Sequence, residues 1–258
     1  MIGRSMKIAT WNVNGIRARQ GQLLEWLATE TPDIVCLQEI KANLDQLPFE
    51  LRDLEGYWAG WHGEKGYSGV GLLVSKTLVT TPPVFTHPAF DFEQRVISAV
   101  LDFGQGPVVT SSFYVPNGGK DYAAKIRFLT DMDAWAAEHQ AAGRALLFAG
   151  DLNVALTELD IHPKERKLNQ VGTRDDERAL ISRLLSRGLV DIARTLHPAD
   201  DALFTWWAPW RNLKQRNIGW RIDYIVASPL LAANATTCVV QREFGTSDHG
   251  PVVATFAG

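Results

Sequence analysis

Short apolar runs alternate with amphipathic stretches along most of the chain. The runs are too short for helices and end at glycine or polar residues, which is typical of buried strands in an α/β protein. Runs separated by a glycine turn, such as 96–103 and 108–114, indicate antiparallel neighbours. The expected strands are 6–11, 34–37, 57–62, 69–75, 96–103, 108–114, 145–149, 222–227, 237–240 and 251–256.

The amphipathic stretches predict four helices between these strands. The longest, 121–141, places apolar residues on one face and stops at Gly143. Another is announced by Thr173 and Asp176, whose spacing is that of a capping box. The expected helices are 21–29, 43–52, 121–141 and a segment that ends at Gly188.

Helices and strands alternate, yet some strands pair as hairpins. This mixture predicts an α/β layered sandwich with mixed sheets, in preference to one doubly wound parallel sheet. No linker, repeat or low-complexity tract divides the 258 residues. We therefore expect one domain over residues 6–257, preceded by a leader at residues 1–5.

Two polar side chains follow the end of the strand at 145–149. Gly150 lets the backbone turn, and Asp151 and Asn153 follow it. Alternate residues of an extended chain point the same way, so this acid and this amide can face one point. Such a strand end can hold a hydrated metal, a water or a phosphate oxygen, although an Asx turn explains the segment equally well.

Other expected strand ends carry the same kinds of side chain. Each one alone is explained by a cap, a turn or a surface acid. Their recurrence at six places in the chain instead indicates that these side chains line one shared polar site. The residues concerned are Asn12, Asn14, Glu39, Tyr114, Asn117, Asp151, Asn153, Asp223, Asp248 and His249.

Four of these residues are carboxylates, and their repulsion in one cleft requires a compensating positive charge. A divalent cation would supply it. Oxygen ligands favour Mg²⁺, with Mn²⁺ as a substitute, over Zn²⁺, and neither Cys36 nor Cys238 has metal-ligand spacing. Because Mg²⁺ takes one or two carboxylates directly, the other acids are expected to do proton chemistry.

The composition narrows the class of protein. A hydrophobic content of 46% suffices for a large core, and no run approaches the about 18 apolar residues of a membrane helix. The N-terminus lacks the apolar region of a signal peptide, so we expect a cytoplasmic protein without a membrane partner. Cys36 and Cys238 lie in apolar runs, which indicates buried thiols in a reducing compartment.

The net charge of −3 argues against a surface coated with positive charge. The distribution of charged residues along the chain is more informative than the net charge. Residues 206–222 contain four basic residues, no acid and four of the nine tryptophans. A solvated loop over core aromatics explains most charge runs, but tryptophans combined with basic residues favour a nucleic-acid surface.

Seven motifs follow one another from about residue 6 to residue 256. They are WNVNGIR at 11–17, LQE-x-K at 37–41, GYSG at 66–69, YVPN at 114–117, GDLN at 150–153, WRIDY at 220–224 and SDH at 247–249. In this order they resemble the exonuclease III family of AP endonucleases, within the DNase I-like endonuclease, exonuclease and phosphatase superfamily.

The resemblance implies a four-layered α/β sandwich, with two mixed β-sheets packed face to face, flanked by helices, and a site at one rim. It implies an exodeoxyribonuclease III or class II AP endonuclease that depends on Mg²⁺. Such an enzyme hydrolyses the phosphodiester 5′ to abasic sites in double-stranded DNA and also acts at 3′ ends, including blocked ones. A monomer associated with the bacterial nucleoid for DNA repair is the corresponding expectation.

The resemblance also assigns roles by motif position. Glu39 would be the main metal ligand, with Asn12 and Asp248 nearby. Asp151, with Asn153, would position and deprotonate the attacking water. The implied metal-binding set is Glu39, Asp248, Asn12, Asp151, Asn153 and His249.

Two further roles concern the scissile phosphate. Asp223 would orient His249, whose protonated ring would stabilise the developing charge. Tyr114 would act from its hydroxyl on the phosphate or on the leaving group, and the sequence does not distinguish these two roles. The sequence also does not distinguish a mechanism with one metal ion from a mechanism with two.

Binding roles follow in the same way. Trp206, Trp220 and Ile222 fall where this family builds the apolar pocket for a flipped-out baseless sugar. Trp210 and Lys120 fall where some members insert residues into the two grooves. The candidates for phosphate contacts or for bracing the site are Arg17, Lys41, Tyr67, Arg95 and Asn117.

The chain departs from the family pattern at two places. Lys120 replaces a common arginine, which keeps the charge but loses the bidentate fork. Asn169 and Gln170 stand where paired asparagines are common, in a segment that is one residue shorter. The grip on the phosphate, and the balance of exonuclease against endonuclease activity, are therefore open.

Two other functions compete with the nuclease. A superfamily relative could use the same metal site on another phosphate ester, as an inositol phosphatase, a sphingomyelinase or a deadenylase does. A binding module could keep the fold and lose catalysis, but it would be expected to lose acids that repel one another. All four acids and His249 are present, so the sequence favours the nuclease.

Overall fold

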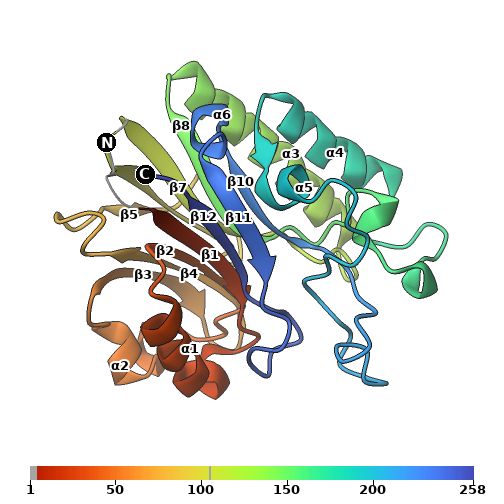
Figure 1. The fold of residues 1–258 in the computed structure, drawn as a ribbon, viewed down its shortest axis with the longest axis horizontal. Helices are drawn as coiled ribbons and strands as arrows, with labels where there is room; N and C mark the ends of the chain where they lie inside the picture. The colour runs from red at the N-terminus through yellow and green to blue at the C-terminus, as the bar shows by residue number, and fades with distance from the viewer. Residues whose placement is uncertain (1–4, 105) are drawn as a thin grey trace.

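The computed structural model describes residues 5–104 and 106–258. Of the expected leader at residues 1–5, only Ser5 lies within them. Two six-stranded sheets pack face to face, with helices on both outer sides (Figure 1). The expected four-layered α/β sandwich is therefore confirmed.

The first sheet has the strand order β11-β12-β1-β2-β4-β3. Only its β1–β2 pair is parallel, so the sheet is mixed, as predicted. Its strands are β1 (Met6–Asn12), β2 (Ile34–Gln38), β3 (Tyr57–Glu64), β4 (Tyr67–Ser75), β11 (Ala235–Val240) and β12 (Val252–Phe256).

The second sheet has the strand order β5-β6-β7-β8-β10-β9. Here β7 and β8 are the parallel pair, and the other pairs are antiparallel. Its strands are β5 (Phe85–Thr86), β6 (Val96–Asp102), β7 (Pro107–Tyr114), β8 (Ala145–Asp151), β9 (Val190–Asp191) and β10 (Asp223–Ala227).

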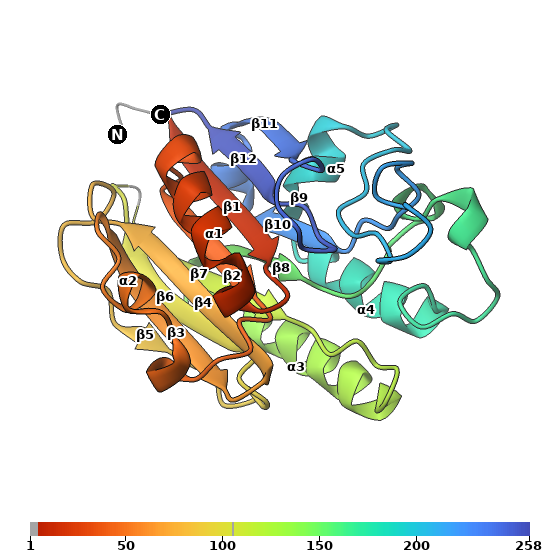
Figure 2. The ribbon, with the colours of Figure 1, turned by 90° about the horizontal axis from the view of Figure 1, so that it is seen from below.

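Six α-helices are assigned within the described residues. Figure 2 shows α1 and α2 against the first sheet, and α3 and α4 together against the second. Among the described residues, no helix combines the length and the apolar character needed to cross a membrane. The helices are α1 (Ile16–Glu30), α2 (Phe49–Arg52), α3 (Tyr122–Ala141), α4 (Asp175–Ser186), α5 (Ile192–Leu196) and α6 (Pro229–Ala232).

Apolar side chains fill three layers. Ile8, Leu72, Leu147 and Ile225 belong to the central layer between the sheets. A second layer joins the outer face of the second sheet to α3 and α4, and a third joins the outer face of the first sheet to α1. Burial on both faces explains why the strands appear in the sequence as nearly continuous apolar runs.

Two of the predicted helices were wrong in their bounds. Helix α1 begins at Ile16 and not at residue 21, because Gly15, with φ of 101°, turns the chain directly into it. The stretch 43–52 is broken at Pro48 into a 3₁₀ turn at Leu44–Gln46 and α2, because proline at that point lacks the backbone N–H that a continuous helix needs.

The predicted capping box is also wrong. Helix α4 begins at Asp175, and the Thr173 hydroxyl donates to the carbonyl of Gln170 at 2.9 Å instead of capping the helix. The elements β5, β9, α5 and α6 were missed because two to five residues are too few to show a period. Gly143 and Gly188, both left-handed, end α3 and α4 as expected.

Candidate active site

The registers of the two sheets bring the polar strand ends to one rim. In the second sheet, Asp151 at the end of β8 is paired with Tyr114 of β7 on one side and with Asp223 of β10 on the other. In the first sheet, the end of β1 at Asn12 is paired with Gln38. Residues that lie far apart in the chain therefore become neighbours.

Asn12 joins the two sheets. Its fully buried side chain donates from Nδ2 to Glu39 Oε1 and to Asp151 Oδ2, both at 3.0 Å. Its own Oδ1 accepts the backbone N–H of Asn14 at 3.0 Å. Asn12 therefore sets the spacing between the two carboxylates and is itself held in one rotamer.

Glu39 is partly exposed, whereas Asp151 and Asp223 are buried. Tyr114 donates its hydroxyl to Oε1 at 3.0 Å, and Lys41 Nζ lies 2.8 Å from Oε2. Burial raises the pKa of Glu39, but Lys41 and Asn12 outweigh it and hold the pKa below its usual value. The residue has φ of 52°, a conformation that non-glycine residues tend to adopt only where the surroundings require it.

His249 lies between two buried acids. Its Nδ1 is 2.9 Å from Asp223 Oδ2, and its Nε2 is 3.9 Å from Asp151 Oδ2. Burial by itself lowers the pKa of the ring, but Asp223, Asp151 and Asp248 together raise it to about 10. The imidazole is therefore protonated at neutral pH, with Nδ1 donating to Asp223 and Nε2 directed toward the Asp151 side.

Asp151 is almost fully buried. Its Oδ1 accepts the backbone N–H of Asn153 at 2.9 Å, and its Oδ2 accepts from Asn12. Burial, Asp223 and Glu39 raise its pKa to about 7, although the His249 charge opposes them. A carboxylate with a pKa in this range is suited to accept a proton near neutral pH.

Asn153 is held at both ends of its side-chain amide. Nδ2 donates to the carbonyl of Val115 at 2.9 Å, and Oδ1 accepts from Asn117 Nδ2 at 3.2 Å. Its φ of 52° is again left-handed. The predicted turn at Gly150 is wrong, because β8 continues through Gly150 to Asp151 and the chain leaves the strand only at Asn153. Asp151 and Asn153 nevertheless both line the same cavity.

Three of the predicted metal-binding residues come together. Glu39, Asp151 and His249 each offer a ligand atom within 4.8 Å of the others, so this group can hold a metal ion. With His249 protonated, neither ring nitrogen has a free lone pair, so Glu39 and Asp151 are the two residues of this group that can coordinate a metal ion. Asp248 does not belong to this group, because its Oδ1 accepts from Asn14 and its Oδ2 accepts from Trp206 Nε1, at 2.9 and 3.0 Å.

A cavity of about 380 Å³ opens above these acids. Trp206 and Trp220 meet edge to face with ring centroids 6.0 Å apart, and Ile222 extends the apolar wall. The predicted apolar pocket residues therefore lie beside the polar strand ends. The cavity is lined by Glu39, Tyr114, Asn117, Asp151, Asn153, Gln170, Val171, Gly172, Trp206, Trp220, Ile222, Asp248 and His249.

Arg95 braces one side of the site. It is only 2% exposed, its guanidinium lies 4.6 Å from the Tyr114 ring centroid, and it donates to the Tyr67 hydroxyl at 3.0 Å. Glu93 balances its charge at 2.7 Å. Burial, Glu39 and Asp151 raise the pKa of Tyr114, which keeps its hydroxyl protonated as a donor.

Six of the ten predicted DNA-binding residues do not line the cavity: Arg17, Lys41, Tyr67, Arg95, Lys120 and Trp210. Arg17 is exposed in the first turn of α1, Lys120 is exposed just before α3, and Trp210 is 58% exposed in the 206–222 stretch. Lys41, in contrast, lies inside the site, where it contacts Glu39 and donates to Asn14 Oδ1 at 2.6 Å.

The sequence did not identify every residue at the site. Val171 and Gly172 line the cavity, and Lys125 of α3 lies behind it, with Nζ donating to the Asn153 carbonyl at 2.7 Å. None of them lies at a strand end, which was the pattern used to select candidates. A lysine within the apolar face of α3 was the one available indication.

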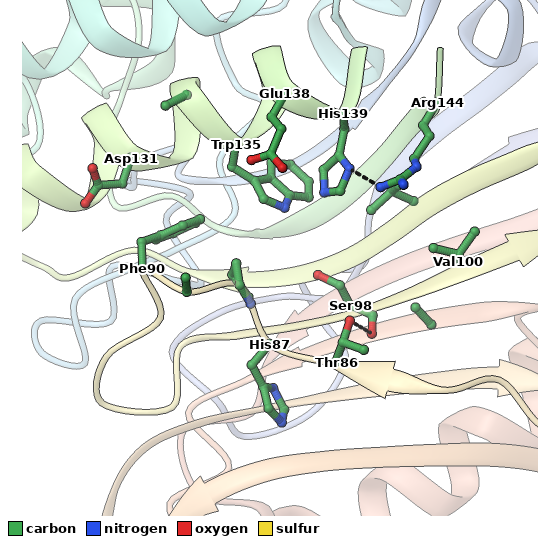
Figure 3. A pocket seen from close by; sticks show the side chains of 15 residues that line it. Thr86, His87, Phe90, Ser98, Val100, Asp131, Trp135, Glu138, His139 and Arg144 are labelled. Atoms are coloured by element: carbon green, nitrogen blue, oxygen red, sulfur yellow. Dashed lines mark hydrogen bonds between the residues drawn. The ribbon is translucent and has the colours of Figure 1, made fainter. Parts of the chain in front are cut away.

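A second cavity, of about 520 Å³, lies between α3 and β6 (Figure 3). Arg144 donates to His139 Nδ1 at 3.0 Å on one side of it, and burial and Arg144 lower the pKa of that imidazole. Asp131 and Glu138 are exposed and do not form part of a buried charged cluster. Among the residues that line this second cavity there is no buried charged cluster like the one at the strand ends.

The chain is similar to known proteins over nearly its whole length. Residues 9–249 match the Endonuclease/Exonuclease/phosphatase family. The chain is 33% identical to the DNA repair nuclease APEX1 of Danio rerio, over 98% of this chain and 83% of that protein. It is 32% identical to the exodeoxyribonuclease of Bacillus subtilis, over 96% of this chain and 98% of that protein.

Solved structures give the same picture. A Neisseria 3′ phosphatase, NExo, bound to a product DNA hairpin, superposes with a TM-score of 0.86 at 30% identity, over 98% of this chain and 100% of that one. An AP endonuclease from Archaeoglobus fulgidus superposes with a TM-score of 0.85 at 29% identity, over 97% and 99%. Sequence and fold similarity therefore lead to the same group of proteins.

Proposed function

Because the chain belongs to the endonuclease/exonuclease/phosphatase family, we propose that it is a DNA repair nuclease that hydrolyses the phosphodiester 5′ to abasic sites in duplex DNA. One observation carries the proposal. Glu39, Asp151 and a protonated His249 converge beneath a cavity walled by Trp206 and Trp220. A phosphate can reach the acids and the imidazolium while a sugar lies against the tryptophans.

Asp151 is the proposed base. Its raised pKa and its hydrogen bonds to Asn12 and Asn153 suit a carboxylate that takes a proton from the attacking water. The water oxygen forms the new bond to phosphorus, the bond to the 3′ oxygen breaks, and that oxygen takes up a proton from solvent water to give a 3′-hydroxyl. Asn153 positions the water.

His249 is the proposed stabiliser of the phosphate. Asp223 holds Nδ1, so that a protonated Nε2 remains to donate to a non-bridging oxygen as negative charge develops there. Tyr114 stays protonated and supplies a second donor. These donors lie in fixed positions in a buried site, where they act more strongly than in water.

A divalent cation fits the donor set. Glu39 and Asp151 offer carboxylate oxygens, no thiolate takes part, and the cluster has more acids than the His249 charge balances. We assign Mg²⁺, with Mn²⁺ as a substitute, held by Glu39 with Asp151 and Asn12 beside it. When bound, the cation supplies positive charge to the phosphate oxygens and lowers the repulsion among the acids.

The cavity is the proposed pocket for the baseless sugar. Trp206, Trp220 and Ile222 offer apolar surface to a deoxyribose that has left the helix, as a flipped nucleotide must do to reach a buried site. Exposed Arg17, Lys120 and Trp210 are the proposed contacts to the flanking duplex. The relatives named as an exodeoxyribonuclease and a 3′ phosphatase support additional activity at 3′ ends.

The first test is nicking of a labelled duplex that carries one tetrahydrofuran abasic analogue. We expect fast cleavage on the 5′ side of the lesion with Mg²⁺, none with EDTA, and slow cleavage of the undamaged duplex. A soluble inositol phosphate serves as the comparison substrate. If only the inositol phosphate were hydrolysed, the metal site would stand and the DNA substrate would be wrong.

A further inference from the structure

A buried ion pair lies directly behind the proposed active site. Lys125 of α3 and Glu177 of α4 are both inaccessible to solvent and form a salt bridge. Both side chains originate from the outer helix layer, yet they point toward the rim of the second sheet. An isolated charge in such a place is strongly unfavourable, so each depends on the other.

Each member of the pair also holds one wall of the cavity. Lys125 Nζ donates to the carbonyl of Asn153 at 2.7 Å. Glu177 accepts the backbone N–H of Gly172 with both carboxylate oxygens, each at 2.9 Å. The carbonyl of Gly172 in turn accepts from Ala155 N at 2.7 Å, which closes a ring of contacts around residues 153–172.

One of the two backbone positions has a conformation that needs such support, and the other is a glycine that adopts its conformation freely. Asn153 is a non-glycine residue with φ of 52°, and Gly172 has φ of 92°. A Cβ on Gly172 would meet the Trp220 ring at 2.9 Å, so the loop packs closely against the apolar wall. A loop in this conformation is free to relax once its hydrogen bonds are removed.

We propose that Lys125 and Glu177 form a positioning pair for catalysis, in which Lys125 holds Asn153 and Glu177 holds the Gly172 wall of the cavity. Neither residue reaches the substrate. The pair acts through Asn153, whose backbone N–H donates to Asp151 Oδ1, and through the packing of the Gly172 wall against Trp220. The inference rests on the proposed nuclease function for its kinetic test, but not for its spectroscopic test.

The main variant combines Lys125→Met with Glu177→Gln. It removes both charges at similar volume and keeps an acceptor for Gly172, so no buried charge is left unpaired and the fold is expected to survive. On the abasic duplex we expect kcat to fall by about 10- to 100-fold while KM changes less than about 3-fold, the range expected for a displaced catalytic group. Lys125→Arg, which keeps the charge and the donors, should restore part of kcat.

The matched control uses a charged pair on the same two helices. Asp133 of α3 pairs with Arg187, which follows α4, at 2.6 Å and with Arg183 at 2.8 Å, and none of the three lines the cavity. Asp133→Asn with Arg187→Gln should lower the melting temperature and leave kcat unchanged. Equal losses of kcat in both double variants would overturn the proposal, because they would reflect general destabilisation.

The second readout does not depend on activity. The side-chain amide of Asn153 donates to Val115, and its ¹H–¹⁵N signal can be assigned from its loss in Asn153→Asp. We expect this signal to shift and broaden in the Lys125→Met, Glu177→Gln variant and to stay in place in the control. If the signal does not move in the Lys125→Met, Glu177→Gln variant, the positioning proposal is wrong. If instead the wild-type protein cleaves no DNA, the nuclease function is wrong, and the NMR test of the positioning pair still applies.

Discussion

At the scale of single residues, the site depends on two opposite shifts of pKa. His249 gains a proton because Asp223 and its other acidic neighbours outweigh burial, whereas Asp151 is pushed toward its neutral form chiefly by burial. The two groups lie 3.9 Å apart. Environments that separate acid and base in this way are typical of catalytic sites, where one group holds a proton and another is poised to take one.

Asp151→Asn tests the proposed base. The amide keeps the size of the side chain but cannot accept the proton, so we expect kcat on the abasic duplex to fall by about 100- to 10,000-fold with little change in DNA affinity. Steady-state kinetics and a gel-shift assay measure the two quantities. Asp131→Asn, at an exposed acid of α3, is the control; near-normal turnover of Asp151→Asn would move the base elsewhere.

Metal binding should depend on pH through Asp151. Since its pKa is raised from 3.8 to about 7, its contribution to the stability of the metal-free protein is fully present below about pH 4 and is lost as the pH rises through 7. His249 stays charged over this range because its pKa is about 10. Above pH 7 the metal therefore meets a carboxylate that is already ionised.

We accordingly expect Mg²⁺ to raise the melting temperature more at pH 8 than at pH 5.5, relative to EDTA. Thermal unfolding followed by fluorescence measures the four conditions. In Asp151→Asn the dependence on pH should largely disappear. A shift of equal size at both pH values in the wild-type protein would show that Asp151 does not govern metal binding.

At the scale of elements, the strand ends position the residues of the site. The backbone of β8 approaches β7 so closely at Gly150 that a Cβ there would collide with the carbonyl of Phe113. This close approach sets Asp151 opposite Tyr114. Glycine is therefore required at this point by the packing of two backbones as well as by its φ of 155°.

Gly150→Ala should destabilise the protein by about 3 kcal/mol or more, because the collision involves backbone and cannot be relieved by a rotamer change. Gly21→Ala is the matched control. Gly21 lies within α1, where a Cβ would meet nothing within 4 Å, so alanine there should stabilise by about 0.5–1 kcal/mol. Urea unfolding gives both values, and equal stability of the two variants would contradict the argument.

At the scale of the whole molecule, the site exists because two sheets present their ends at one rim. Asn12 and Glu39 come from the first sheet and Asp151, Tyr114 and Asp223 from the second, so the sandwich itself assembles the acids. The 206–222 stretch then returns over this rim through bridges that join residue 206 to residues 220 and 249. Substrate selection should therefore depend on that stretch, and bond cleavage on the sheets.

Trp220→Ala tests whether the 206–222 stretch selects the substrate independently of bond cleavage by the residues of the sheets. Removing the ring opens the apolar wall, so we expect the preference for abasic over undamaged duplex to fall by about 10-fold or more while metal binding is retained. The ratio of the two nicking rates measures the effect. Phe49→Ala, at a side chain that is 79% exposed on α2, is the control. An unchanged ratio in Trp220→Ala would place the sugar pocket elsewhere.

By itself the sequence determined the class of fold and indicated which residues could form the site. Apolar runs that stop at Gly150 or at Asn12 specify strands and their polar ends, because period and turn preference are local properties of the chain. Its motifs also resembled the exonuclease III family, and the comparisons confirmed the family and the nuclease relatives.

Only the tertiary structure decided which polar groups touch. Asp248 and Glu39 look equivalent in the sequence, yet Glu39 joins Asp151 and His249 whereas Asp248 is engaged by Asn14 and Trp206. Lys125 and Glu177, 52 positions apart, gave no local indication of their pairing. Contacts of this kind depend on strand register and helix packing, which no short stretch of sequence encodes.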